Sequence, residues 1–457
     1  MRCLGLDLGS TSIKGAVLDL GRANLSQFHS EPFPGPEPTD IPLGHEVCLN
    51  KVMAATRSVL ARLIEAAPDA DELYICSQMG GLVLTDSLGK PLTRYISWRD
   101  QRTLSNYSTE FSFLAKAEIQ IGPKGLSSLG NELKAGSASA LLFWLAQKKL
   151  LPSGVVASSL GEWVVAQLCQ APLAMHPTMA IGWLDLPRKD WSYESFEKLG
   201  LNQVAFPRLV WDLAPVGTFH LGQRKLRLHP VLGDQQCALF GTNLKPGELS
   251  INASTGSQVS RLNSEFYPGP YQSRFYFENL MLDTITHIPA GRSLNTIVDL
   301  LTEIPRANGV SLDAWGYIAK ELKRIPNTQS SRPSGLDSGL SFFPGPLGET
   351  GYLSGITLEN LSVRNWVIAA LDSMAGGYRI CADRLGTVPG WEGLVLSGGL
   401  AHSLPTLRER IGEAFGNIAI RETPGIEETL MGLLRLAQNQ SGFSSAPENQ
   451  HPSGVIE

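Results

Sequence analysis

Alternation of apolar and polar residues is most regular at the start of the chain, where residues 4–20 read LGLDLGSTSIKGAVLDL. Period-two alternation split by small turn residues predicts a β-hairpin over residues 1–20. Asp7 stands inside the first strand, although an ionised carboxylate is costly in apolar surroundings unless it is paired or bound to a metal. The hairpin is therefore the first candidate site.

Apolar residues at helical spacing predict three helices, over residues 49–67, 138–150 and 160–170. Residues 72–92 have the pattern of a strand, a glycine-rich turn, a second strand and a further turn. Because strands and helices alternate along the chain, the pattern favours an α/β layered fold.

The opening pattern recurs once, at residues 248–262, where alternating residues again flank a Ser-Thr-Gly-Ser turn. Thr255 follows Thr11 by 244 residues, which is far too long for a solenoid period. The recurrence predicts two domains of similar design, residues 1–243 and 244–438. The Ser-, Pro- and Gln-rich tail, residues 439–457, is predicted to be disordered.

Composition narrows the function without identifying it. A chain of 457 residues exceeds the usual size of one core, and its 43% hydrophobic and 18% charged content is ordinary for a globular protein. A net charge of −5 argues against a partner with a phosphate backbone, so we expect no nucleic acid. The six cysteines form no C-x-x-C pair, and no apolar stretch is long enough to span a membrane. We therefore expect a cytoplasmic protein with reduced thiols, with no membrane contact, either a monomer or a homodimer.

The opening hairpin has the residues of an anion site. Gly9 allows a ligand to approach the backbone, and Lys14 adds a positive charge. Asp7 is a candidate ligand of Mg²⁺ through water, because magnesium keeps much of its hydration shell. Further donors are the hydroxyl and N–H groups of Ser10, Thr11 and Ser12. A tight turn with no ligand explains the same residues and remains open.

Two later segments carry weaker signals. Asp234 follows a glycine and precedes a short helical run, so it is either a simple N-cap or a general base that accepts a proton from a substrate hydroxyl. Residues 393–415 read as a strand, a Gly398-Gly399 turn and an amphipathic helix, which is one way to seat a nucleotide. Neither a P-loop nor a G-x-G-x-x-G motif is present.

The segment from residue 78 to residue 102 mixes apolar walls with hydrogen-bonding groups, as sugar sites do. Surface turns with an ion pair between Asp100 and Arg102 are the alternative. The candidate residues are Gln78, Met79, Gly80, Trp98 and Asp100.

Taken in order, these motifs resemble the FGGY carbohydrate kinases of the actin, Hsp70 and sugar kinase superfamily, over about residues 3–437. The resemblance rests on D-x-G-S-T-S, then Q-M, W-R-D-Q-R, G-D-Q-Q, S-T-G and S-G-G. It implies two actin-like, ribonuclease H-like α/β domains, each a mixed sheet flanked by helices, with a catalytic cleft between them. Within the family the chain looks most like sedoheptulokinases, notably over residues 274–298 and 341–361.

The resemblance also implies roles for individual residues. Asp7 would organise Mg²⁺, and Asp234 would be the catalytic base and contact the substrate together with Gln235. The β- and γ-phosphates of ATP would meet Ser10, Thr11, Ser12 and Lys14, and from the second domain Ser254, Thr255 and Gly256. Adenosine would lie against Gly398, Gly399 and Leu400, with Ser403 nearby. The sugar pocket would be lined by Gln78, Met79, Gly80, Trp98 and Asp100.

Three departures from the family pattern leave the sugar uncertain. The usual Gly-Glu-Arg reads Gly348-Glu349-Thr350, His176-Pro177-Thr178 replaces an Asp followed by a small residue, and Gly80 stands where many members carry His or Arg. The expected function is ATP-dependent phosphorylation of a primary hydroxyl of a ketose, with sedoheptulose or a similar ketose first. Alternatives are a xylulose, ribulose or glycerol kinase and, from another class, a non-catalytic actin-like ATP-binding regulator.

Overall fold

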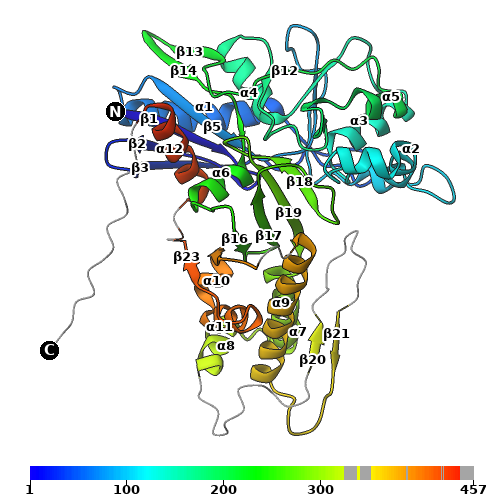
Figure 1. The fold of residues 1–457 in the computed structure, drawn as a ribbon, viewed down its shortest axis with the longest axis vertical. Coiled ribbons are helices and arrows are strands. Elements are labelled where there is room, and N and C mark those ends of the chain that lie inside the picture. Colours follow the sequence, from blue (N-terminus) through cyan, green and yellow to red (C-terminus); the bar gives the residue numbers. More distant parts are fainter. Residues whose placement is uncertain (324–336, 340–350, 387–389, 424, 426, 443–457) are drawn as a thin grey trace. The chain divides into compact units, whose positions relative to one another are not determined.

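A computed structural model describes residues 1–323, 337–339, 351–386, 390–423, 425 and 427–442. The chain forms two compact units (Figure 1). The first unit contains Met1–Asn243, Ser273–Leu280 and the chain from Glu427 onward. The second contains Leu244–Gln272 and Met281–Ile426. The sequence placed residues 273–280 and 427–438 in a second domain, whereas they pack with the first unit.

The central sheet of the first unit is mixed, with seven strands within the described residues in the order β13-β14-β5-β1-β2-β3 and with β15 also paired to β5. Strands β1 and β2 pair antiparallel, so the hairpin predicted over residues 1–20 is confirmed. Strands β1, β14 and β15 all run parallel to β5. The strand bounds are β1 Arg2–Leu8, β2 Ser12–Asp19, β3 Asn24–Pro32, β5 Glu72–Ser77, β13 Gly217–Leu221, β14 Arg224–Leu228 and β15 Leu232–Gly233.

Helices of the first unit follow the predicted apolar spacing. The three predicted helices are present, and α3 stops at Gln147, just before Lys148 and Lys149. The bounds are α1 Leu49–Ala66, α2 Phe113–Ser128, α3 Ala138–Gln147, α4 Leu160–Cys169, α5 Tyr193–Lys198, α6 Asp234–Gly241, α12 Glu428–Gln440 and a 3₁₀ turn Arg102–Leu104. Residues 72–92 form β5 and then β6 across a glycine turn, as predicted.

Short strand pairs complete the first unit. They are β4 Glu46–Val47 with β7 Tyr95–Ile96, β6 Val83–Thr85 with β8 Val156–Ser158, β9 Ala174–Met175 with β12 Arg208–Leu209, and β10 Leu184–Asp185 with β11 Asp190–Trp191. In the first pair, β7 leads directly into the segment that carries Trp98 and Asp100.

The last helix, α12, packs against α6 and β1 of the first unit, and Figure 1 shows it in red beside them. Glycines permit this close approach. A Cβ at Gly432 would lie 1.9 Å from the carbonyl oxygen of Cys237, and one at Gly241 would lie 2.1 Å from that of Glu428. The predicted disordered tail begins inside α12, and its residues from 443 lie outside the described residues.

The sheet of the second unit is also mixed, and within the described residues its strands follow the order β19-β17-β16-β22-β23. The second hairpin, predicted at 248–262, is the antiparallel pair of β16 and β17, and β22 runs parallel to β16. The bounds are β16 Glu248–Asn252, β17 Ser257–Asn263, β18 Gln272–Phe275, β19 Met281–Ile288, β20 Asp337–Gly339, β21 Tyr352–Ser354, β22 Gly393–Ser397 and β23 Ile420–Glu422. The helices are α7 Gly291–Ala307, α8 Ala314–Lys323, α9 Val363–Leu385, α10 Gly399–Ser403 and α11 Pro405–Ala414.

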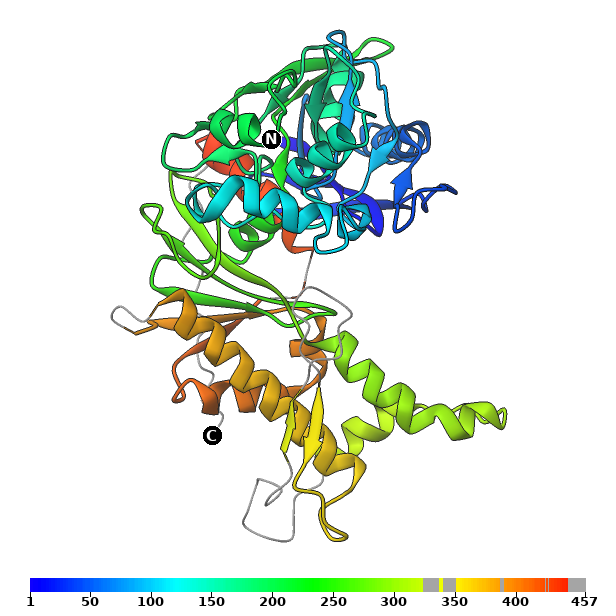
Figure 2. The same cartoon turned by 90° about the vertical axis from the view of Figure 1, so that its right-hand side faces the viewer.

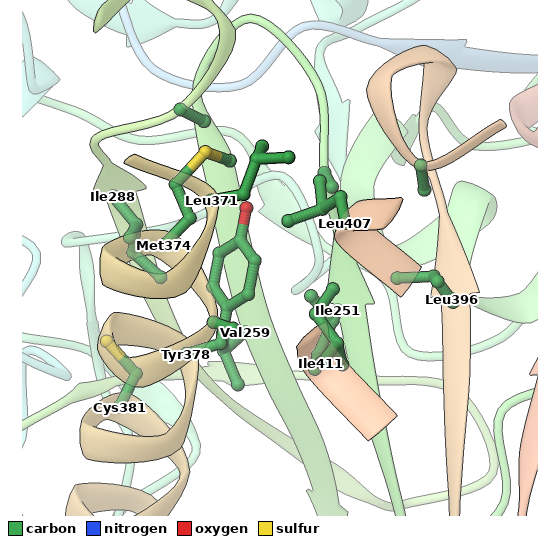
Figure 3. Packing of buried hydrophobic residues seen from close by; sticks show 14 of the residues in the cluster. Ile251, Val259, Ile288, Leu371, Met374, Tyr378, Cys381, Leu396, Leu407 and Ile411 are labelled. Atoms are coloured by element: carbon green, nitrogen blue, oxygen red, sulfur yellow. The ribbon is translucent and has the colours of Figure 1, made fainter. Parts of the chain in front are cut away.

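The core of the second unit lies between α9, α11 and the sheet. Met374, Tyr378 and Cys381 of α9 belong to one buried cluster with Ile251 and Val259 of the sheet (Figure 3). The hydroxyl of Tyr378, which belongs to this cluster, is paired at 2.7 Å with Ser257 Oγ. In Figure 2, α7 (yellow-green) extends outward from this sheet.

None of the helices in the described part of the chain combines the length and the apolar composition that spanning a bilayer requires. The predicted departure at Gly348-Glu349-Thr350 lies outside the described residues.

Candidate active site

Three parallel strands of the first unit place two carboxylates at the same edge of the sheet. Asp7 on β1 is level with Cys76 on β5, and Cys76 is level with Leu232 on β15. Two residues after Leu232 the chain enters α6 at Asp234. In open α/β sheets ligands bind outside the carboxyl ends of such strands, so the geometry brings Asp7 and Asp234 to the expected place.

Asp7 is almost completely buried, with 4% of its surface exposed. Its Oδ2 accepts a hydrogen bond of 2.7 Å from Thr429 Oγ1 and lies 3.6 Å from Lys14 Nζ, its cross-strand partner. Within the described residues no N–H or O–H group donates to Oδ1. Burial raises the pKa of Asp7, while Lys14, Thr429 and the Cys76 thiol oppose that rise.

Asp234 is the first residue of α6, and Gly233 is the N-cap, so the interpretation of Asp234 as a simple N-cap is wrong. Its Oδ1 accepts a hydrogen bond of 2.8 Å from the Gln235 N–H. Burial, and next the charge of Asp7, raise the pKa of Asp234 to about 7. The Gln235 N–H and the positive charge of Arg274 oppose this rise.

Two thiols, Cys76 on β5 and Cys237 on α6, lie near both carboxylates and are completely buried. They are hydrogen-bonded to each other, and burial raises the pKa of both thiols. Burial accounts for the direction of both carboxylate pKa shifts, and the Cys76 thiol opposes the rise at Asp7.

The turn between β1 and β2 is held from outside the hairpin. Arg99 Nη2 donates to Ser10 Oγ at 3.1 Å, and Gln78 Nε2 donates to the Gly9 carbonyl at 3.3 Å. Thr11 is exposed and Ser12 is half-buried. The hydroxyls expected to meet phosphate therefore surround a fixed turn, beside a cation, Arg99, that the sequence did not indicate.

Gln78 and Trp98 form one hydrogen-bonded unit. Trp98 Nε1 donates to Gln78 Oε1 at 3.1 Å, and the Tyr95 hydroxyl donates to the same oxygen at 3.4 Å. Trp98 is half-buried, and the guanidinium of Arg99 lies 5.3 Å from the centre of its ring. Gln78 therefore orients Trp98, whose ring face remains the apolar surface that a sugar could use.

Asp100 is completely buried. Its two oxygens accept hydrogen bonds of 2.8 Å from Nε and Nη2 of Arg102, and Oδ2 also accepts one of 2.6 Å from the His45 N–H. Arg102 continues to Glu46 at 2.7 Å. The expected ion pair exists, but inside the protein rather than at a surface turn, and this position favours support of the Trp98 segment over direct contact with a substrate.

Arg274 forms hydrogen bonds with both Glu132 and Gln235. Its Nε donates to Glu132 Oε1 at 2.6 Å, and its Nη1 donates to Gln235 Oε1. Both Arg274 and Glu132 are buried. Burial lowers the pKa of Lys134, whose ammonium lies near the same pair.

His176 and Thr178 lie next to Gly233, the residue before Asp234. Thr178 Oγ1 accepts a hydrogen bond of 3.1 Å from the Gly233 N–H and lies 2.9 Å from His176 Nδ1. Burial lowers the pKa of His176 to about 4, so its ring is neutral at pH 7. This departure from the family pattern therefore fixes the start of α6, close to Met79, whose sulfur lies against Gly233.

In the second unit the predicted nucleotide residues gather at the carboxyl ends of β16 and β22. The Leu400 N–H donates to the Ala253 carbonyl at 3.0 Å, and the Thr255 carbonyl accepts a hydrogen bond of 3.0 Å from the Arg292 N–H at the start of α7. Ser254 Oγ donates to the Gly256 carbonyl at 3.0 Å. Gly398 has a φ of 93°, which only glycine adopts without strain. Gly399 and Ser403 lie in α10, where Ser403 Oγ donates back to the Gly399 carbonyl at 2.8 Å.

A comparison with protein families decides what this arrangement is. Residues 2–241 match the N-terminal domain of the FGGY family of carbohydrate kinases. The chain belongs to the FGGY family. This FGGY kinase is accordingly a phosphotransferase that acts on carbohydrate, as the sequence predicted.

Individual relatives of this FGGY kinase are distant. A sedoheptulokinase from Mus musculus is 23% identical over 394 residues, covering 76% of this chain and 77% of the relative. An L-fuculokinase from Salmonella typhi is 28% identical over 295 residues, covering 58% and 59%. A solved "xyloylose kinase" from Brucella ovis superposes with a TM-score of 0.81 at 18% identity, covering 97% of this chain and 91% of that one. The last likeness confirms the predicted fold of two mixed sheets flanked by helices.

Sequence analysis of this FGGY kinase did not predict four residues that form hydrogen bonds in the candidate site. They are Arg99, Glu132, Arg274 and Thr429. Arg99 was adjacent to a predicted residue. Two of the contacts of the other three residues, Glu132 with Arg274 and Thr429 with Asp7, join residues 142 or more positions apart, and neither spacing nor periodicity could reveal such contacts.

Magnesium is a suitable partner for the donor set of this FGGY kinase. No cluster of three or more metal-ligating side chains occurs in the part of the chain that the structure covers. Mg²⁺ commonly binds through one or two carboxylates together with water and phosphate, and Oδ1 of Asp7, a buried carboxylate oxygen, would be the protein ligand in such a set.

Proposed function

We propose that this FGGY kinase transfers the γ-phosphoryl group of ATP to a primary hydroxyl of a ketose, with sedoheptulose or a similar ketose as the first candidate. The observation that carries the proposal is the placement of Asp7 and Asp234 together at the carboxyl ends of β1 and β15. Two carboxylates with different surroundings can take two roles, one towards the metal and one towards the acceptor.

Asp234 is the proposed general base. A base is most effective when its pKa lies near the working pH, and the pKa of Asp234 is about 7. It would accept the proton of the acceptor hydroxyl as the oxygen attacks the γ-phosphorus. Gln235, oriented by Arg274, would hold that acceptor.

Binding of the phosphates is assigned to backbone N–H groups and short hydroxyls of two hairpin turns. From the first unit these are Ser10, Thr11 and Ser12, with Lys14 as the cation, and from the second unit Ser254, Thr255 and Gly256. Adenosine is assigned to Gly398, Gly399, Leu400 and Ser403. Successive N–H groups in such turns form anion-binding concavities.

Asp7 is the proposed residue that holds Mg²⁺, directly or through water. The ion, when bound, neutralises charge that develops on the transferring phosphoryl group. Thr429 fixes the Asp7 carboxylate through Oδ2 and leaves Oδ1 without a protein N–H or O–H donor among the described residues.

The sugar pocket is assigned to Met79, Gly80, Trp98 and Gln235, with Gln78 and Asp100 as supports of Trp98. Sedoheptulose is favoured by the likeness of residues 274–298 and 341–361 to sedoheptulokinases and by the curated relative of that name. Xylulose, ribulose and glycerol remain the alternative acceptors. The free cysteines of the described chain suit a reducing, cytoplasmic setting.

The test is an ADP-release assay of the full chain with ATP, Mg²⁺ and a panel of polyols and ketoses from three to seven carbons. We expect the highest kcat/KM with a seven-carbon ketose. A higher value with xylulose, ribulose, fuculose or glycerol would replace the substrate while keeping the enzyme class. ADP release that does not depend on any sugar would contradict the proposed transfer and favour the nucleotide-binding regulator.

A further inference from the structure

The start of α12 contacts the opening hairpin at Asp7 and Lys14, which are cross-strand partners. Thr429, the second residue of α12, donates from Oγ1 to Asp7 Oδ2 at 2.7 Å. Glu427, the residue before α12, accepts a hydrogen bond from Lys14 Nζ through its Oε2. These contacts join residues more than 400 positions apart in the sequence.

The pairing of Lys14 is unequal. Its ammonium is hydrogen-bonded to Glu427 but lies 3.6 Å from Asp7 Oδ2, beyond a normal hydrogen bond. Glu427 therefore holds the Lys14 ammonium by a hydrogen bond, whereas Asp7 attracts it by charge alone. The Lys14 side chain is 27% exposed and that of Glu427 39%, so solvent and ligands reach this pair more easily than they reach Asp7.

The contacts of Thr429 and Lys14 are with Oδ2 of Asp7, and they leave its other oxygen, Oδ1, without a hydrogen-bond donor among the described residues. Oδ1 is buried and receives no N–H or O–H donor from the described residues. It lies on the side of the phosphate-binding turn, because a Cβ at Gly9 would be 3.7 Å from it. A buried carboxylate oxygen in this state is costly unless a cation or a water completes it.

We propose that the first turn of α12 belongs to the metal site: Thr429 orients Asp7 through Oδ2, and Glu427 draws Lys14 aside, so that Oδ1 stays available to hydrated Mg²⁺. This inference rests on the proposed function, because it assumes that a magnesium nucleotide is the phosphoryl donor. Thr429 and Glu427 are positioning residues, since they act through Asp7 and Lys14. Substitution of such partners of a metal ligand typically lowers metal affinity about 10- to 100-fold.

The experiment measures ADP binding to the full chain by calorimetry, once with Mg²⁺ and once with EDTA. The readout is the dissociation constant of ADP with EDTA divided by that with Mg²⁺. This ratio separates the metal contribution from folding and from nucleotide contacts. We expect Thr429→Val to reduce this ratio about tenfold and Glu427→Gln to reduce it in the same direction. Thr429→Ser keeps the hydroxyl and should keep the ratio of the natural protein.

Thr302→Val is the matched control, because Thr302 Oγ1 donates only to backbone carbonyls within α7, at Val298 and Asp299, and accepts from Arg306. It should leave the ratio unchanged. Unchanged ratios in both Thr429→Val and Glu427→Gln would overturn the inference even if sugar phosphorylation is normal. Should Thr429→Val fail to fold, Glu427→Gln and Thr429→Ser decide the question. A natural protein that binds no ADP at all would instead refute the proposed function, and this inference with it.

Discussion

The negative charge of Asp7 raises the pKa of Asp234, although the two residues are 227 positions apart. The coupling arises because β1 and β15 both run parallel to β5 and end at the same edge of the sheet. Backbone pairing of β1 and β15 with β5 therefore brings the two carboxylates to the same place.

Replacement of Asp234 by Asn should abolish sugar phosphorylation while ATP still binds. The amide is nearly isosteric but cannot accept the proton, so kcat should fall about 10²- to 10⁴-fold, as for the loss of a general base. ADP release and calorimetry with ATP measure the two properties separately. Asp40→Asn, at an exposed loop position, is the control and should retain full activity. Normal turnover in Asp234→Asn would remove this residue from the mechanism.

The pH profile should reveal the environment of Asp234. Because the carboxylate must be ionised to act as a base, kcat/KM should rise with pH through about 7. Arg274 lowers the pKa of Asp234, so Arg274→Met should move this limb to higher pH. Arg224→Met, on the exposed surface of β14, should leave the profile in place. A shift of the limb to lower pH in Arg274→Met would contradict the assigned electrostatics.

The sequence predicted the elements of the site better than the contacts between them. Alternation placed the strand that carries Asp7 and the hairpin whose turn carries Ser254, and helical spacing placed α1, α3 and α4, because burial of one face leaves a local periodic trace. The ion pair of Arg274 with Glu132 leaves no such trace, since its partners are 142 positions apart. The position of α12 was missed for the same reason, because its contacts are set by the close approach of Gly432 to α6.

Trp98 should govern affinity for the sugar rather than for ATP. Its ring is half-buried and is held by the hydrogen bond to Gln78. Trp98→Ala should raise KM for the sugar about tenfold, corresponding to about 1.4 kcal/mol, with little change in KM for ATP. Trp98→Phe keeps an apolar ring but loses the Nε1 donor, so its KM should be intermediate. Replacement of Tyr193, an exposed aromatic residue, by Ala is the control. An equal rise of the KM for sugar and the KM for ATP in Trp98→Ala would indicate loss of structure instead.

Glu162 should make the stability of the first unit depend on pH. It is 1% exposed on α4, its Oε2 accepts a hydrogen bond from Ser159, and Oε1 has no partner within the described residues. Burial raises the pKa of Glu162 to about 7, from about 4.5. Folding therefore favours the protonated acid, and the associated stability, full below about pH 4.5, is lost as pH rises through 7.

Glu162→Gln should remove this dependence, because the amide is neutral at every pH. Relative to the natural protein, the stability gain of the variant should grow between about pH 4.5 and about pH 7 and stay constant above that, with an upper bound of about 3 kcal/mol from the size of the pKa shift. Urea unfolding followed by circular dichroism at several pH values measures the difference, and Glu194→Gln, on the exposed helix α5, is the control. A difference between variant and natural protein that is the same at every pH would show that Glu162 does not titrate in the folded state.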